Sequence, residues 1–240
     1  LMVWCSTSGR ELSPTNRLWM AFSSDRGRTW SRERLFAESR AGRSVLNPTV
    51  YRHTDGGVFV FYNAGNGTSL FEIAYRVSRD SGKTWGGEQV LPVGEDVTSL
   101  MSNPIRLRDG SILLPTSYNR ERRSPGHWTG TVLLSRDGGR SWTRGGDFPV
   151  SVQRGAMEPS IVQLASGRLY GLIRTKSGYQ YETRSDDGGL TWQAPKPSPF
   201  PSPESTGILT RLAGGGLLFV WNRNRVSASR LCSRVHASLP

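Results

Sequence analysis

Short apolar runs alternate with turn residues along the whole chain, and four stretches share one pattern. In each, an apolar run leads through a glycine-containing turn to a second apolar run. Three of the four begin with a polar residue followed by proline. β-branched and aromatic residues fill the runs, which predicts two antiparallel strands joined by a tight turn. The four predicted hairpins span residues 47–63, 103–117, 158–174 and 206–222.

The third hairpin carries charges at two positions where the other hairpins carry neutral polar residues. The residues before proline are Asn47, Asn103 and Glu158. The residues that close the second strands are Asn63, Ser117, Arg174 and Asn222. A charge in a segment otherwise fit for burial is costly unless it is paired. Glu158 and Arg174 are therefore the first candidates for a functional role.

A second pattern, Ser-x-Asp-x-Gly-x-(Thr/Ser)-Trp, occurs four times, at residues 23–30, 78–85, 135–142 and 185–192. It predicts a hairpin turn in which the carboxylate accepts hydrogen bonds from its own loop. The glycine supplies a positive φ, and the Trp ring folds back as an apolar anchor. A calcium loop is the alternative, but the spacing of an EF-hand is missing. We assign a structural role to the four aspartates: Asp25, Asp80, Asp137 and Asp187.

Each repeat divides into four strands, because a third strand precedes each Asp-Gly turn and a fourth follows it. The expected third strands are residues 18–22, 72–77, 131–134 and 179–183. Four strands in every 50 or so residues are typical of the blade of a β-propeller. The proline-rich run 194–203 is interpreted as the crossing from one blade to the next.

The repeated turn matches the Asp-box, and the chain resembles the sialidase (neuraminidase) superfamily of β-propellers over essentially its whole length. The resemblance implies an all-β fold of four-stranded antiparallel blades, of the six-bladed type. The chain supplies four to five blades: three complete repeats and a partial one at each end. We therefore expect residues 1–240 to form a single propeller domain, incomplete at both ends. A ring with fewer blades, closed by both ends, is the alternative.

The composition of the chain limits the classes of molecule that it is expected to bind. The chain has 31 Lys and Arg against 19 Asp and Glu, a formal charge of +12. A solvated arginine-rich surface or attraction to acidic glycans explains this charge, whereas no nucleic-acid-binding motif accompanies it. No apolar run is long enough to span a bilayer, and Cys5 and Cys232 lack metal-site spacing. We expect no metal or other cofactor. The compartment is open, with a secreted or periplasmic location favoured.

The resemblance also implies roles for individual residues. In sialidases, a Glu at this place polarises a tyrosine nucleophile, and the Arg is one of three that hold the substrate carboxylate. Glu158 and Arg174 match these two; an ion pair between blades is the structural alternative. Arg230 is the best match to the third arginine. Glu11 lies nearest to the acid/base position, which is usually Asp in the family; an exposed loop glutamate is the alternative. The first arginine and the tyrosine have no match.

Polar residues at the inner ends of the hairpins complete the expected pocket, as substrate contacts or as hydrogen-bonding rim residues. They are Asn47, Asn63, Asn103, Tyr118 and Asn222. The sequence therefore predicts an exo-α-sialidase or sialidase-like glycoside hydrolase that acts on sialylated or other acidic glycans. The alternatives are a non-catalytic propeller that binds glycans or serves as a scaffold, and a propeller enzyme for another acidic polysaccharide.

Overall fold

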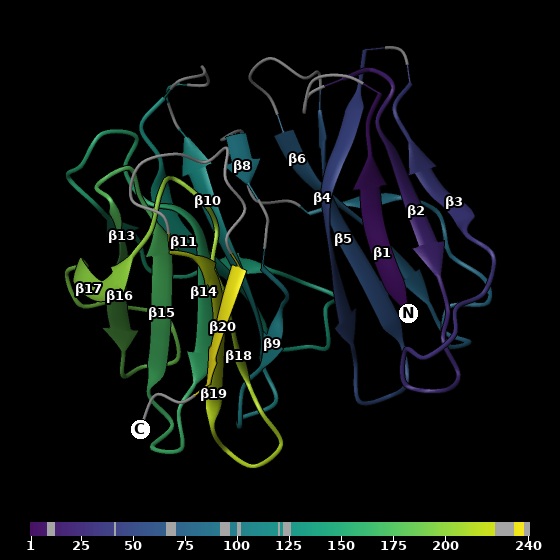
Figure 1. Cartoon of the computed structure of the whole chain (residues 1–240). Helices are drawn as coiled ribbons and strands as arrows, with labels where there is room; N and C mark the ends of the chain where they lie inside the picture. The colour runs from purple at the N-terminus through teal and green to yellow at the C-terminus, as the bar shows by residue number, and fades with distance from the viewer. Residues whose placement is uncertain are drawn as a thin grey trace. The chain divides into compact units, whose positions relative to one another are not determined.

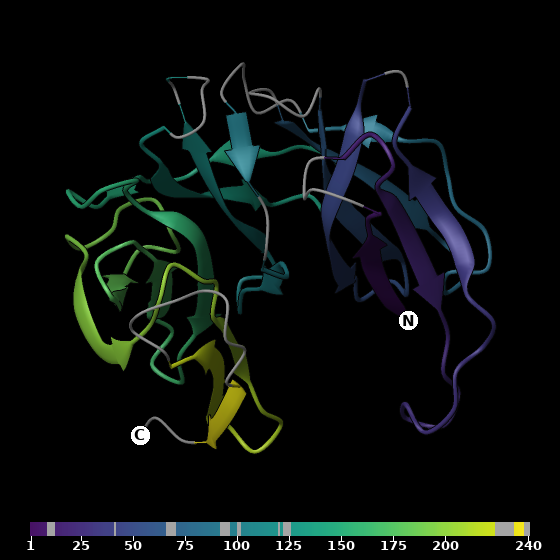
Figure 2. The same cartoon turned by 45° about the horizontal axis from the view of Figure 1, so that its top comes forward.

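The computed structural model describes residues 1–8, 13–40, 42–65, 71–91, 97–99, 102–119, 121, 126–223 and 233–237. Within these ranges, every regular element is a β-strand (Figures 1 and 2). The chain divides into two compact units. Unit 1 comprises residues 1–100 with 122–124, and unit 2 comprises residues 101–121 with 125–240.

Unit 1 contains two antiparallel sheets whose strands follow the order of the chain. The first sheet is formed by β1 (Met2–Ser6), β2 (Arg17–Ala21) and β3 (Arg34–Glu38). The second is formed by β4 (Ser44–Arg52), β5 (Val58–Gly65), β6 (Phe71–Ser78) and β7 (Gln89–Val90). A short strand, β8 (Val97–Ser99), follows β7 in the chain.

Unit 2 contains three antiparallel sheets. In the first, β10 lies between β9 and β11, and β11 pairs in turn with β12 and β13. The bounds are β9 (Ile105–Arg106), β10 (Ile112–Asn119), β11 (Thr129–Ser135), β12 (Thr143–Arg144) and β13 (Phe148–Pro149). The second sheet is β14 (Met157–Gln163), β15 (Leu169–Arg174), β16 (Tyr179–Ser185) and β17 (Lys196–Pro201). The third is β18 (Ile208–Arg211), β19 (Leu217–Asn222) and β20 (Ser233–Ala237).

The four predicted hairpins are confirmed as the pairs β4–β5, β9–β10, β14–β15 and β18–β19. Two of them share an irregularity. The register shifts between Leu46 and Thr49 in the first hairpin, and between Met157 and Ser160 in the third. In both hairpins the shifted segment holds the residue before proline and the proline itself: residues 47–48 in the first and 158–159 in the third. The repeated sequence therefore specifies a β-bulge, because the extra residue cannot be paired in the ladder.

The interpretation of residues 194–203 as a crossing between blades is wrong. Lys196–Pro201 forms β17, the outer strand of its sheet, and Lys196 pairs with Glu182 of β16. Proline is tolerated in this strand because an edge strand has only one neighbour to which it must donate hydrogen bonds.

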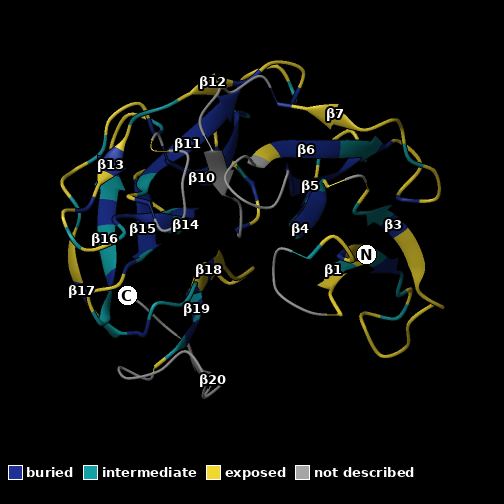
Figure 3. Ribbon diagram, turned by 90° about the horizontal axis from the view of Figure 1, so that it is seen from above, coloured by how far each residue is buried: buried dark blue, intermediate teal, exposed yellow. Residues whose placement is uncertain are grey.

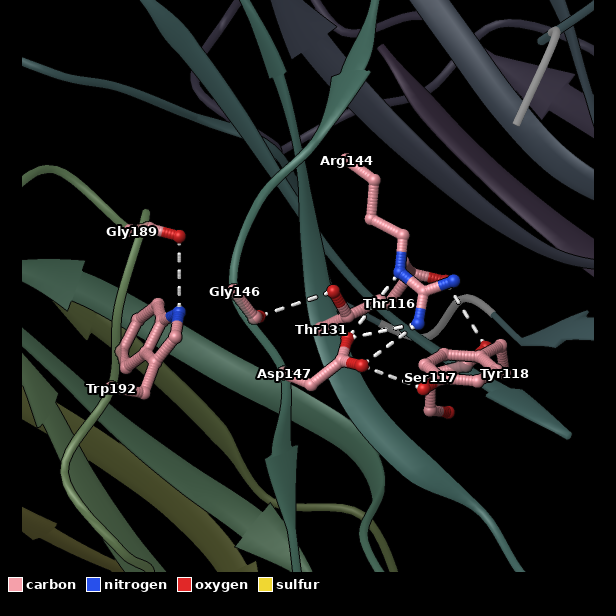
Figure 4. Close-up of polar contacts among 9 residues, drawn as sticks. All are labelled: Thr116, Ser117, Tyr118, Thr131, Arg144, Gly146, Asp147, Gly189 and Trp192. Carbon is pink, nitrogen blue, oxygen red and sulfur yellow. Dashed lines mark hydrogen bonds and ion pairs between the residues drawn. The ribbon is translucent and has the colours of Figure 1, made fainter. Parts of the chain in front are cut away.

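The Asp-box of the third complete repeat shows how the turns are closed. Asp187 accepts hydrogen bonds from the N–H of Thr191 at 2.9 Å, its hydroxyl at 2.5 Å and the hydroxyl of Ser185 at 2.8 Å. Gly189 has a φ of 95°, and its carbonyl accepts a hydrogen bond from the indole of Trp192 at 3.2 Å (Figure 4). The same carboxylate bonds occur at Asp25, Asp80 and Asp137.

The Asp-box tryptophans differ in how far they are buried. Trp192 packs against Phe148 of the preceding sheet, with ring centres 4.9 Å apart, and Trp85 packs against Phe36 at the same distance. Trp30 makes the same bond to its turn glycine but is 45% exposed, so the expectation of a buried anchor fails there. In the described residues, no sheet precedes its own. The hydrophobic core is formed by strands whose residues are almost all buried, such as β5, β10 and β15 (Figure 3).

We predict that Asp187→Ala lowers the melting temperature by several degrees, whereas Asp186→Ala leaves it nearly unchanged. Asp187 accepts four hydrogen bonds inside its turn, and its loss leaves the N–H of Thr191 without that acceptor. In the described part of the chain, the one side-chain contact of Asp186 is an exposed ion pair with Arg168, and such pairs contribute little. Differential scanning calorimetry at neutral pH compares the two variants, which remove the same charge.

The effect should depend on pH. Partial burial opposes the shift, but hydrogen bonds from the hydroxyl and N–H of Thr191 lower the pKa of Asp187 from 3.8 to about 2. A lowered pKa stabilises the fold above the unfolded-state pKa, and this stabilisation is lost as the pH falls through the folded-state value. The difference between the wild type and Asp187→Ala should therefore shrink between pH 4 and pH 2. A difference that stays constant over this range would contradict the assignment.

Candidate functional site

Glu158 and Arg174 form an ion pair at one end of the β14–β15 hairpin. The Nη1 atom of Arg174 lies 2.6 Å from Oε2 of Glu158, and the two side chains are 21% and 11% exposed, respectively. The register explains the contact, because Arg174 pairs with Met157, the residue before Glu158. A charged hydrogen bond of this length in a half-buried setting is strong and directional.

The backbone at Glu158 has an uncommon conformation. Its φ is 45°, and Asn47 at the equivalent place in the first repeat has a φ of 53°. Asn tolerates this left-handed region, whereas most other residues lose roughly 1–2 kcal/mol there. The third repeat has therefore kept the bulge while placing a less suitable residue in it. Strain of this kind often marks functional positions.

Two further hydroxyl groups hold Glu158. Its N–H donates to Oγ of Ser117 at 3.2 Å, and Thr206 donates its hydroxyl to the same Oε2 that Arg174 contacts. Ser117 closes the hairpin of the preceding sheet, and Thr206 opens that of the next. The Glu158 carboxylate is thus a shared acceptor for its own sheet and the following one.

Arg174 retains a donor for a further partner. Its Nε atom is buried and has no acceptor among the described residues. A guanidinium has five N–H groups in a planar fork, so contact with one carboxylate leaves groups for a second. The pair therefore combines a fixed anion with a cation able to bind another carboxylate.

Sequence reasoning did not assign roles to Ser117 and Thr206, although the internal repeats contain the signal. Both stand at the repeat positions that Glu158 and Arg174 occupy in the third hairpin. Comparing the repeats across neighbouring sheets, rather than within one hairpin, would have found them.

The remaining predicted residues lie in different environments. In unit 1, Asn47 is half-buried and Asn63 is buried. In unit 2, Asn103 is exposed and Asn222 is half-buried. Glu11 and Arg230 lie outside the described residues. The roles of Glu11 as acid/base, of Arg230 as third arginine and of the four asparagines as substrate contacts remain predictions.

Tyr118 belongs to a polar cluster across the first sheet of unit 2 (Figure 4). Its hydroxyl donates to Asp147 at 2.7 Å, and Nη2 of Arg144 contacts both oxygens of the same carboxylate, at 2.9 and 3.0 Å. The Arg144 guanidinium also lies 3.7 Å from the centre of the Tyr118 ring. Burial, followed by the hydrogen bond to Asp147, raises the pKa of Tyr118. This phenol is therefore a neutral donor.

Two kinds of feature are absent from the described part of the chain. No group of three or more His, Cys, Asp and Glu side chains there can hold a metal ion. No helix in those residues is long and apolar enough to cross a membrane.

Comparison with known proteins identifies the family to which the chain belongs. Residues 1–237 match the BNR repeat-like domain, and the chain belongs to this family. It is 22% identical over 204 residues to a sialidase of Clostridium perfringens, covering 74% of this chain and 52% of the relative. The match to a sialidase of Paraclostridium sordellii covers 49% of that protein. The chain thus spans about half the length of the sialidases it matches.

Solved structures show the same fold. The Hadza microbial sialidase Hz136 superposes with a TM-score of 0.76 at 17% identity, over 97% of this chain and 51% of that chain. A protein of unknown function from Dyadobacter fermentans superposes with a TM-score of 0.77 at 20% identity, over 90% of this chain and 67% of that chain. The predicted fold class is confirmed: the sheets are antiparallel blades of a sialidase-like β-propeller, and the protein is sialidase-like.

We predict that the double variant Glu158→Asn/Arg174→Asn is at least as stable as the wild type. It recreates the neutral pair of the first repeat, Asn47 and Asn63, and relieves the strain at position 158. The single variant Arg174→Asn should melt several degrees lower, because it leaves a half-buried carboxylate without its cation.

Thermal melts of the wild type, both single variants and the double variant complete a double-mutant cycle. The cycle separates backbone strain from the ion pair. A double variant that melts no higher than Arg174→Asn would show that the left-handed bulge does not disfavour glutamate.

Proposed function

We propose that this protein is an exo-α-sialidase-type glycoside hydrolase that removes terminal sialic-acid-type sugars from glycoconjugates. The proposal rests on one observation: in a sialidase-like chain, a single repeat replaces two neutral residues by Glu158 and Arg174, which contact each other. The relatives named as sialidases support it. Sialylated or other acidic glycans are the expected partners.

Arg174 is proposed to bind the carboxylate of the sugar acid. Its guanidinium contacts Glu158 through one atom, Nη1, and its side chain keeps 21% of its surface exposed. Bidentate binding of a planar carboxylate suits an arginine fork better than the single ammonium of lysine. Arg230 is proposed as a second carboxylate-binding residue, in keeping with the resemblance of its position.

Glu158 is proposed as the carboxylate that polarises a tyrosine nucleophile. The donors on Oε2, from Arg174 and Thr206, hold this carboxylate in a fixed position, from which it could accept a hydrogen bond from the phenol. An ionised carboxylate beside the phenol would increase its nucleophilic character. Glu11 is proposed as the general acid that protonates the leaving sugar.

We expect Glu158→Gln to lower kcat/KM for a 4-methylumbelliferyl sialoside by at least ~10²-fold, by analogy with the loss of a proton-handling group. Glu182→Gln is the matched control. Glu182 lies in the same sheet, its side chain is 12% exposed, and it accepts hydrogen bonds from Tyr170 and Arg184. Turnover that is equal in the wild type and Glu158→Gln would remove Glu158 from the mechanism.

Binding is measured separately by calorimetry with sialyllactose. Arg174→Lys should weaken binding about tenfold, because it keeps the charge but loses the second hydrogen bond. Binding without turnover in the wild type would instead favour a glycan-binding propeller. Binding of a uronic-acid glycan in place of sialyllactose would indicate an enzyme for another acidic polysaccharide.

A further inference from the structure

The first strands of the three sheets in unit 2 border a cavity of about 460 Å³. These strands, β9, β14 and β18, lie near one another in Figure 1. Ser160 links two of them, since its Oγ accepts a hydrogen bond from the N–H of Leu209 at 2.9 Å. The volume falls in the range of small-molecule sites and suits a ligand of about two sugar rings.

Three arginines, Arg106, Arg108 and Arg211, line this cavity where the strands reach their turns. Alignment of the repeats shows that two of them occupy equivalent positions. Counted from the residue that opens each hairpin, Arg108 and Arg211 correspond to Gln163 in the third repeat and to Arg52 in the first. Four repeats thus place arginine three times at one position.

Backbone and amide groups hold two of the arginines in place. Arg108 donates its N–H to Oε1 of Gln163 at 2.9 Å and its Nη2 to the carbonyl of Ala165 at 2.6 Å. Arg211 donates Nη1 to the carbonyl of Gln163 at 3.0 Å. These acceptors are neutral. These bonds therefore supply neither guanidinium with a compensating anion, and they leave N–H groups for another partner.

The positive charge of the cavity is not balanced by the protein. Its lining contains no Asp or Glu, and in the described part of the chain none of the three arginines forms an ion pair. Five other arginines of unit 2 do pair with a carboxylate: Arg144, Arg154, Arg168, Arg174 and Arg184. Three like charges around one hollow repel one another unless a counter-anion is present.

We propose that this cavity is a binding site for a saccharide that carries a sulfate or phosphate group. Arginine forks match the oxygens of such tetrahedral groups and bind them through charged hydrogen bonds. The three arginines lie at the turn ends of the strands, and Glu158 is the second residue of β14, near the opposite end of that strand. Five residues of strand, about 16 Å, separate Glu158 from Gln163. The site is therefore separate from the Glu158–Arg174 pair.

Calorimetry on the whole chain tests the proposal with four probes: inorganic sulfate, glucose 6-phosphate, a sulfated disaccharide derived from heparin, and neutral maltose. We expect the sulfated disaccharide or the sugar phosphate to bind more tightly than the inorganic ion, and maltose not to bind. The preferred probe identifies sulfate or phosphate as the natural group. Binding should weaken as the salt concentration rises.

The variant Arg108→Gln/Arg211→Gln should weaken this binding at least about tenfold, because two charged hydrogen-bonding groups are lost. Glutamine is a suitable replacement, since the fold already carries Gln163 at the equivalent position. Arg140→Gln removes one charge from an exposed Asp-box turn and should leave the affinity unchanged. If the double variant does not fold, Arg106→Gln alone should weaken binding severalfold.

Two results would overturn the proposal: none of the charged probes binds, or Arg140→Gln weakens binding as much as the cavity variants do. The second result would show that net charge, rather than the cavity, attracts the anion. The variant Arg174→Gln tests whether this site is independent of the proposed sialidase site. It should leave binding of the sulfated or phosphorylated probe intact, whether or not the protein hydrolyses a sialoside.

Discussion

The left-handed backbone at residue 158 is the constraint on which the candidate site depends. The bulge sets the start of the inner strand and lets a side chain there contact the neighbouring strand and the next sheet. Asn occupies this conformation easily in the first repeat, and Glu does not. The interactions with Arg174, Thr206 and Ser117 offset that cost, so stability and function are coupled at this residue.

Much of the fold could be predicted from the sequence because its signals are local. Turn glycines, Asp-box residues and alternating apolar runs specify hairpins within about 20 residues of chain, and these hairpins formed as expected. A comparison of the repeats also showed that the third one has Glu158 where the first two have Asn, and Arg174 where the others have Asn or Ser. Both side chains belong to one hairpin, whose register brings them together.

Other features depend on neighbouring sheets and could not be predicted in this way. The contact of Thr206 with Glu158 joins residues 48 apart in sequence. Trp30 has the same motif as Trp192 but is exposed, because no sheet precedes its own among the described residues. The run 194–203 was misread because proline argues against a strand in general, whereas the outer position of β17 permits it.

The same proline-rich strand has a consequence for the behaviour of the protein at high concentration. Pro197, Pro199 and Pro201 occupy every second position of β17, the last strand of its sheet. An approaching strand from another molecule would find few N–H donors there, so it could not extend the ladder. The outer border of this sheet is thereby protected against the edge-to-edge association that starts fibrillar aggregation.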